Sequence, residues 1–135
     1  MEAQEKTLNT YAQELEVEMW AEYIETPEGA TEWQKGADSY LLTFTRGDVE
    51  EKFNYYQGKA HTEEPSLATG LECLVSDYQL LESCPTLEDF CDEFGWNKEN
   101  YKSFNALQEN ARKMKELFTD KELTELMRIL EEANA

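Results

Sequence analysis

The chain has 135 residues, of which 40% are hydrophobic and 31% charged, and its formal net charge at pH 7 is −18. So negative a charge repels nucleic acid and anionic membranes, which argues against direct binding to either and leaves basic surfaces as the expected partners. No segment approaches the roughly 20 apolar residues that cross a bilayer, and the first residues lack the pattern of a signal peptide, so we expect a cytoplasmic protein.

The first part of the chain has the pattern of a short helix and a strand. Residues 7–14 fit a helix, and from Leu15 onward apolar residues alternate with acidic ones. An alternation of period two predicts a strand over residues 15–24, with one buried and one exposed face. A loop follows, in which we expect Trp33 to be the apolar anchor. The exposed face of the predicted strand presents Glu16, Glu18, Trp20 and Glu22.

Two further strands are predicted over residues 40–46 and 49–56, which are rich in aromatic and β-branched side chains. The dipeptide between them, Gly47-Asp48, suits a two-residue hairpin turn. A turn of this kind fixes the register of the two strands and places four large side chains on one face. The expected cross-strand pairs are Leu42 with Phe53 and Tyr40 with Tyr55.

After Pro65 the apolar residues recur with the period of helices, and four helices are predicted. Pro85 separates the first from the second, and Gly95 ends the second. The residues expected to cap their N-termini are Ser66, Thr86, Asn97 and Thr119. The exposed side of the short second helix carries Glu88, Asp89, Asp92 and Glu93.

Strands followed by helices predict an α+β fold, in which a small three-stranded antiparallel sheet is followed by three to four helices packed on one face. We expect a single domain over residues 1–135, with the strands up to about residue 58 and the helical part over residues 66–133. The longest helix is expected to bury Tyr101, Phe104, Leu107, Ala111, Met114 and Phe118.

The negative charge is concentrated in two segments. Residues 1–34 contain nine acids and one base, and residues 62–97 contain nine acids and no base. Residues 98–121, by contrast, carry a net charge of +2. The two acidic segments are therefore the candidate interaction surfaces, although a charge run of this kind can also serve solubility alone.

No catalytic motif accompanies the charge, and we predict that the protein is not an enzyme. Glu50 and Lys52 form a Glu-x-Lys pattern, which is half of a metal-dependent nuclease core, and Asp38 or Glu28 could supply a further acid. This pattern is short and common, and an acidic protein repels a nucleic-acid substrate.

No metal or cofactor is expected either. His61 is the single histidine, and although Glu63 and Glu64 lie near it, a loop histidine bonded to the backbone is the simpler interpretation. The three cysteines contain no Cys-x-x-Cys pair, which argues against a disulfide framework or a zinc ribbon. We expect them to be reduced, with Cys73 and Cys91 on the buried faces of their helices or at the borders of those faces.

A family resemblance is carried by five segments, residues 33–37, 55–61, 64–65, 71–77 and 87–96. Together they make the chain resemble a group of small acidic proteins encoded by phages and prophages. The resemblance covers most of residues 15–118 and implies a mobile-element context. In that context small acidic proteins without catalytic motifs are often inhibitors of host defence, including anti-CRISPR proteins and mimics of DNA.

The resulting prediction is a non-catalytic phage-type accessory protein in the host cytoplasm. It would bind and block a basic nucleic-acid-binding host protein, such as a CRISPR effector or a restriction enzyme, as an anti-CRISPR or anti-restriction inhibitor and nucleic-acid mimic. Trp20 is the expected apolar anchor among the carboxylates. The alternative is a phage structural or assembly accessory protein, which could form a homodimer and whose acidity serves solubility only.

Overall fold

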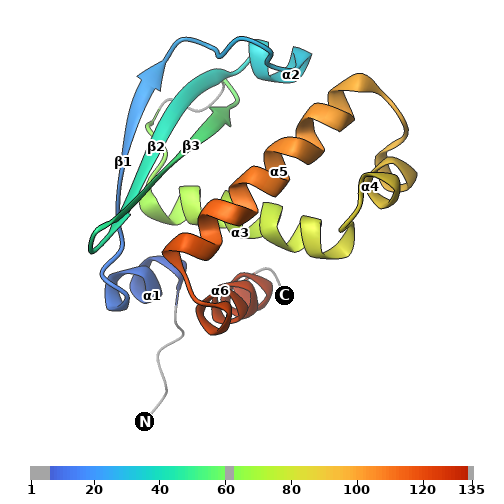
Figure 1. The fold of residues 1–135 in the computed structure, drawn as a ribbon. Coiled ribbons are helices and arrows are strands. Elements are labelled where there is room, and N and C mark those ends of the chain that lie inside the picture. The colour runs from blue at the N-terminus through green and yellow to red at the C-terminus, as the bar shows by residue number, and fades with distance from the viewer. Residues whose placement is uncertain (1–6, 60–62, 134–135) are drawn as a thin grey trace.

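A computed structural model describes residues 7–59 and 63–133 and shows an α+β fold, as the sequence predicts (Figure 1). Within the described residues the three strands form one antiparallel sheet in the order β1-β2-β3. The strands are β1 (Glu18–Ile24), β2 (Asp38–Arg46) and β3 (Val49–Gln57). The helices are α1 (Leu8–Glu14), α2 (Glu32–Lys35), α3 (Leu67–Ser83), α4 (Leu87–Phe94), α5 (Lys98–Leu117) and α6 (Asp120–Ala133).

The hairpin formed by β2 and β3 has the predicted register. Gly47 has a φ of 59°, which a type II′ turn requires at its first central position and which glycine adopts without strain. This tight turn matches the twist of the strands and leaves Arg46 opposite Val49. Leu42 therefore faces Phe53, and Tyr40 faces Tyr55, as expected.

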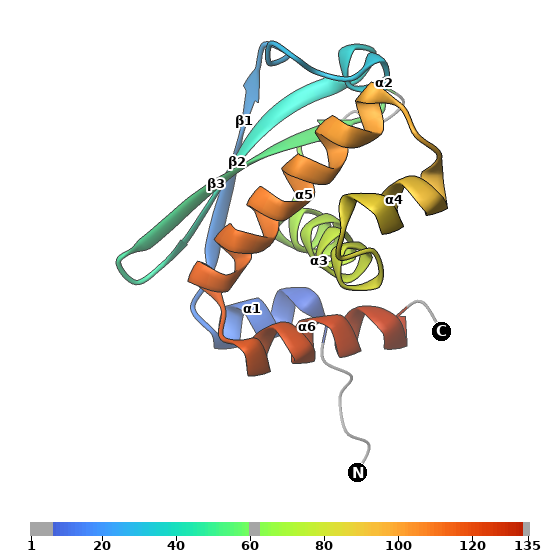
Figure 2. The same cartoon turned by 45° about the vertical axis from the view of Figure 1, so that its right-hand side comes forward.

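The helices lie on one face of the sheet, some of them directly against the strands and others against those helices. In Figures 1 and 2, α3 and α5 cross this face, while α4 packs against α5, and α6 lies beside α1 and α3. Gly70 on α3 approaches the sheet closely, because a Cβ atom there would lie 3.1 Å from both Leu42 Cδ1 and Met19 Sδ. A side chain at this position would therefore clash with side chains of the strands.

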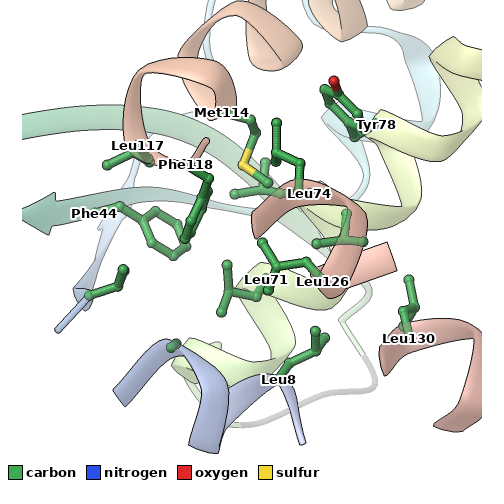
Figure 3. Close-up of a cluster of buried hydrophobic side chains, with 14 of the residues drawn as sticks. Leu8, Phe44, Leu71, Leu74, Tyr78, Met114, Leu117, Phe118, Leu126 and Leu130 are labelled. Carbon is green, nitrogen blue, oxygen red and sulfur yellow. The ribbon is translucent and has the colours of Figure 1, made fainter. Parts of the chain in front are cut away.

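Two clusters of buried side chains hold the fold together. The main core lies between the sheet and the helices and includes Phe44, Leu71, Met114 and Leu126, each at most 1% exposed (Figure 3). The second, smaller core lies between α4 and its neighbours α3 and α5. It consists of Cys84, Phe90, Phe104 and Leu107.

The predicted helix starts are confirmed by side-chain caps. Ser66, Thr86 and Asn97 each accept a hydrogen bond from the backbone N–H three residues later. Thr119 and Glu122 exchange two hydrogen bonds, from Thr119 N to Glu122 Oε1 (2.8 Å) and from Glu122 N to Thr119 Oγ1 (3.2 Å), which is a capping box.

The prediction of a strand from residue 15 was wrong at its start. Leu15 instead ends α1, and Glu16 adopts a left-handed conformation with a φ of 61°. Glu16 N donates to Gln13 O, and Val17 N donates to Ala12 O, which is the Schellman arrangement that closes a helix. β1 begins only at Glu18, so Glu16 is not part of the row of carboxylates on the strand.

Several aromatic residues that were expected to be buried are exposed, Trp33 and Tyr101 among them. The segment before β2 contains the short helix α2, which the Thr31/Gln34 capping box starts, and its Trp33 is 64% exposed. Tyr101 in the first turns of α5 is 46% exposed, whereas Leu117, which was not expected in the core, is buried. Across the described part of the chain no helix combines the length and apolar character that crossing a membrane requires.

Candidate partner-binding surfaces

The first candidate surface is the face of the sheet that the helices leave open (Figure 2). Glu18, Trp20 and Glu22 lie on this face at alternate positions of β1, as predicted, and Trp20 is 50% exposed. The strand pairing places Trp20 beside Thr43, and Thr43 beside Lys52 of β3. On the open sheet face, the exposed base Lys52 therefore lies in the same cross-strand row as Trp20.

The second candidate surface is the exposed side of α4, and the four acids predicted there are all exposed. Asp89 and Glu93 both act electrostatically on the thiol of Cys84, whose pKa is raised by burial and by these two carboxylates. The helix has no base in its last turn. Within residues 7–59 and 63–133 no ion pair neutralises any of these carboxylates. The α4 acidic face consists of Glu88, Asp89, Asp92 and Glu93.

Exposed aromatic side chains lie directly after the α4 acidic face. Phe94, the last residue of α4, is 50% exposed, and Trp96 is 73% exposed. Neither Phe94 nor Trp96 was predicted from the sequence as a binding residue. The sequence Phe94-Gly95-Trp96 at the end of the helix is the signal from which exposed aromatic side chains could have been predicted. We call the α4 acidic face together with Phe94 and Trp96 the α4–α5 corner.

The backbone of this corner is held by specific contacts. The Phe94 ring lies 4.9 Å from the ring of Phe90, which in turn lies 5.6 Å from Phe104 in the second core. Asn100 Nδ2 donates hydrogen bonds to Phe94 O (3.0 Å) and to Gly95 O (2.7 Å). The turn that presents Trp96 is therefore fastened to the start of α5.

The arginines of the protein are used within the fold. Arg46 bonds Glu122 and the carbonyl of Leu117, and Arg112 bonds Glu109 and Glu116. Arg128 likewise contacts two carboxylates of its own helix, α6. The ion pairs thus neutralise acids on α5 and α6, and the charge of β1 and α4 remains uncompensated among the described residues.

Glu51 and Glu116 form a carboxyl pair between β3 and α5. Burial raises the pKa of Glu51, and its hydrogen bond with Glu116 and the charge of that carboxyl raise the pKa further, against smaller opposing effects of Lys113 and Arg112. Glu51 Oε2 is buried and has no hydrogen-bond partner. The charged form of Glu51 is therefore unfavourable in the folded protein.

Glu51→Gln is expected to raise the free energy of unfolding at neutral pH by about 1 kcal/mol, because it removes a buried charge beside a like charge. The raised pKa means that the penalty is absent at low pH, so the gain should disappear at about pH 4. Urea unfolding of the parent and of Glu51→Gln at neutral pH and at about pH 4 measures this difference in the free energy of unfolding. Glu50→Gln, on the exposed face of the same strand, is the matched control and should show no such gain at either pH.

Of the cysteines, Cys73 differs from the prediction in its burial, whereas Cys91 lies at the border of the buried face as expected. Cys84 is buried in the second core, Cys91 is half-buried, and Cys73 is exposed on α3. Desolvation of the Cys73 thiol, with the nearby carboxylates of Asp77 and Glu72, raises its pKa to about 11. The Cys73 thiol is therefore protonated at neutral pH, which does not suit a nucleophile.

The residues considered for a nuclease are not brought together. Glu50 and Lys52 share the open sheet face, but Glu50 pairs with Thr45, seven residues along β2 from Asp38. Seven residues of strand span roughly 24 Å, too far for one metal site. No group of three or more His, Cys, Asp or Glu residues that could hold a metal occurs in the described ranges. His61 lies outside the described residues, so the expectation for it stays a prediction.

An open depression of about 670 Å³ lies between the hairpin turn and the junction of α5 and α6. Its lining includes Glu16, Lys115 and Glu116, and also Arg46, which already bonds Glu122. Charges of both signs meet there without converging on a common point. The depression therefore adds a surface feature but no recognisable catalytic arrangement.

No protein-family model matches the sequence, and neither a curated protein nor a solved structure matches the chain. The fold and its surfaces define a small α+β protein with an acidic corner that bears exposed aromatic side chains.

Proposed function

We propose that this protein is a non-catalytic, phage-type accessory protein that binds a basic nucleic-acid-handling host protein and blocks its nucleic-acid surface. A CRISPR effector or a restriction enzyme is the expected kind of partner. The observation that supports this proposal is the exposure of Phe94 and Trp96 beside four carboxylates that have no ion-pair partner among the described residues. Solubility alone favours the carboxylates, but it does not favour exposed aromatic rings beside them.

Part of the α4 acidic face reduces the stability of the free protein, although Glu88 and Asp89 lie in the first turn, where the helix dipole favours acids. Its acids lie three or four residues apart, so like charges are neighbours on the helix surface and repel one another. Asp92 and Glu93 lie near the negative end of the helix dipole, where acids are unfavourable. A basic partner would relieve both penalties on binding. Carboxylates would meet the Lys and Arg side chains that otherwise contact phosphates.

Charge and aromatic side chains would make different contributions to such a complex. The charge of the whole protein would speed the encounter with a basic surface, and this effect weakens as salt screens the charges. Exposed aromatic side chains that become buried in the interface would supply most of the affinity.

The charge-reversal prediction tests the proposal. Changing Glu88, Asp89, Asp92 and Glu93 to Lys is expected to weaken binding at least tenfold, since several favourable pairs become repulsive. Changing Glu18 and Glu22 to Lys, on the open sheet face, is expected to weaken binding less. The immobilised protein is incubated with a host lysate at low salt, and the proteins that high salt releases are identified. Each released protein is then bound to DNA, and the displacement of this DNA by added parent protein is measured. A basic nucleic-acid-binding protein that loses its DNA is the expected result.

The control is the double variant Lys115→Glu and Lys121→Glu, at two exposed bases, which should not weaken binding. Lys113 is unsuitable as a control because its Nζ donates to Lys52 O (2.5 Å) and lies over the Phe53 ring. If both acidic variants bind as the parent does at physiological salt, the proposal fails. The acidity would then serve solubility only, as in the alternative of a phage assembly protein.

A further inference from the structure

We infer that the α4–α5 corner, and not the open sheet face, makes the principal contact with the partner, and that it binds arginine side chains of a basic segment. This inference rests on the proposed function and specifies where and how the partner is recognised.

The corner offers the two kinds of group that arginine prefers. A guanidinium is planar, stacks on aromatic faces and donates paired hydrogen bonds to carboxylates. Tryptophan is the best aromatic partner for such a cation, and Trp96 is the most exposed large hydrophobic side chain of the described residues. Phe94 adds a second half-exposed ring next to the carboxylates. Lysine can use the negative charge of the corner, but it stacks less well and lacks the planar fork.

The distribution of bases favours the corner over the sheet face. Residues 62–97 contain no Lys or Arg, so the acids of α4 lie in a segment without positive charge. The nearest bases in sequence are Lys98, which begins α5, and Lys102, whose Nζ donates to Gly29 O (3.3 Å) in the segment before α2. The corner thus has four acids beside one base, Lys98, whereas the sheet face has three, Glu18, Glu22 and Glu50, and places its base Lys52 in the row of Trp20.

The corner is also ordered before binding. Phe94 packs on Phe90 of the second core, and Asn100 Nδ2 donates to the carbonyls of two consecutive peptides, Phe94–Gly95 and Gly95–Trp96. Asn97, which directly follows Trp96, is held in place by its hydrogen bond from Asn100 N (2.8 Å). Side chains on a preorganised backbone lose less conformational entropy when they bind.

The test uses the full chain and two fluorescent peptides of equal length and charge, one of alternating arginine and serine and one of alternating lysine and serine. Fluorescence anisotropy at low salt measures binding. The parent is expected to bind the arginine peptide about two- to fivefold more tightly than the lysine peptide, as stacking on an exposed ring suggests. Trp96→Ala should reduce this preference to about one, while Trp20→Ala, the matched control, should keep it.

Three results would overturn the inference. Equal affinity of the parent for both peptides would show attraction by charge without stacking. A loss of the arginine preference in Trp20→Ala but not in Trp96→Ala would place the contact on the sheet face. The proposed function survives either of these two results. If neither peptide binds the parent, the inference and the proposed function fail together. Because Trp96 is 73% exposed, its replacement should leave the thermal unfolding midpoint unchanged, which separates lost recognition from lost folding.

Discussion

Gly70→Leu is expected to lower the free energy of unfolding by about 3 kcal/mol, near the upper end of the usual cost of overpacking. A Cβ atom alone would lie 3.1 Å from Leu42 Cδ1 and from Met19 Sδ, and 3.4 Å from Phe44 Cζ. Leu42 and Phe44 are at most 1% exposed and cannot move into solvent. The remaining atoms of a leucine fit only if α3 moves away from the sheet, which would loosen the main core.

Urea unfolding followed by circular dichroism measures this effect. Thr69→Leu is the matched control, because Thr69 is exposed on the same turn of α3 and its replacement adds apolar atoms without entering the core. The control should change the free energy of unfolding by less than about 0.5 kcal/mol. Parent-like stability of Gly70→Leu would mean that α3 does not approach the strands as closely as described.

Arg46→Met is expected to lower the free energy of unfolding by about 2 kcal/mol, less than for a fully buried pair because the ion pair is partly open to water. Arg46 Nη1 donates to Glu122 Oε1 (2.6 Å) and to Leu117 O (2.9 Å), and Nη2 donates to Glu122 Oε2 (2.8 Å). The two side chains are 29% and 16% exposed. The methionine would fill the space but leave Glu122 without its cation.

The pH dependence of this effect follows from Glu122. Arg46, with a smaller contribution from the backbone N–H of Thr119, lowers the pKa of Glu122 from 4.5 to about 2. A lowered pKa stabilises the fold above the ordinary pKa, and this stabilisation is lost as the pH falls toward the folded value. The difference between parent and Arg46→Met should therefore be largest near neutral pH and shrink from about pH 5 toward pH 2.

Arg128→Met is the matched control, because the ion pairs of Arg128 among the described residues are with Glu125 and Glu132 of its own helix, and its side chain is 46% exposed. It should leave the unfolding midpoint nearly unchanged, as exposed pairs on a helix contribute little. A difference between parent and Arg46→Met that stays constant down to about pH 2 would contradict the role assigned to Glu122.

The parts of the fold that local chemistry determines could be predicted from the sequence. The β2–β3 register depends on a two-residue turn and on alternation, and both are visible in Gly47-Asp48 and its flanks. The helix starts depend on a side chain that bonds a backbone N–H three residues away, as at Ser66 and Asn97. The exposure of the acids on β1 and α4 follows from the same periodicities, because charged side chains remain in water.

The end of α1 and the aromatic part of the candidate site depended on tertiary structure. Glu16 occupies a left-handed position that usually holds glycine, and neighbouring structure must compensate for its strain, so no local signal marked it. An aromatic residue is buried only if another element covers it. The packing of α4 and α5 covers Phe90 and Phe104 but leaves Phe94, Trp96 and Tyr101 exposed. Periodicity shows which side chains share a face, but only the packing of the elements decides which faces reach water.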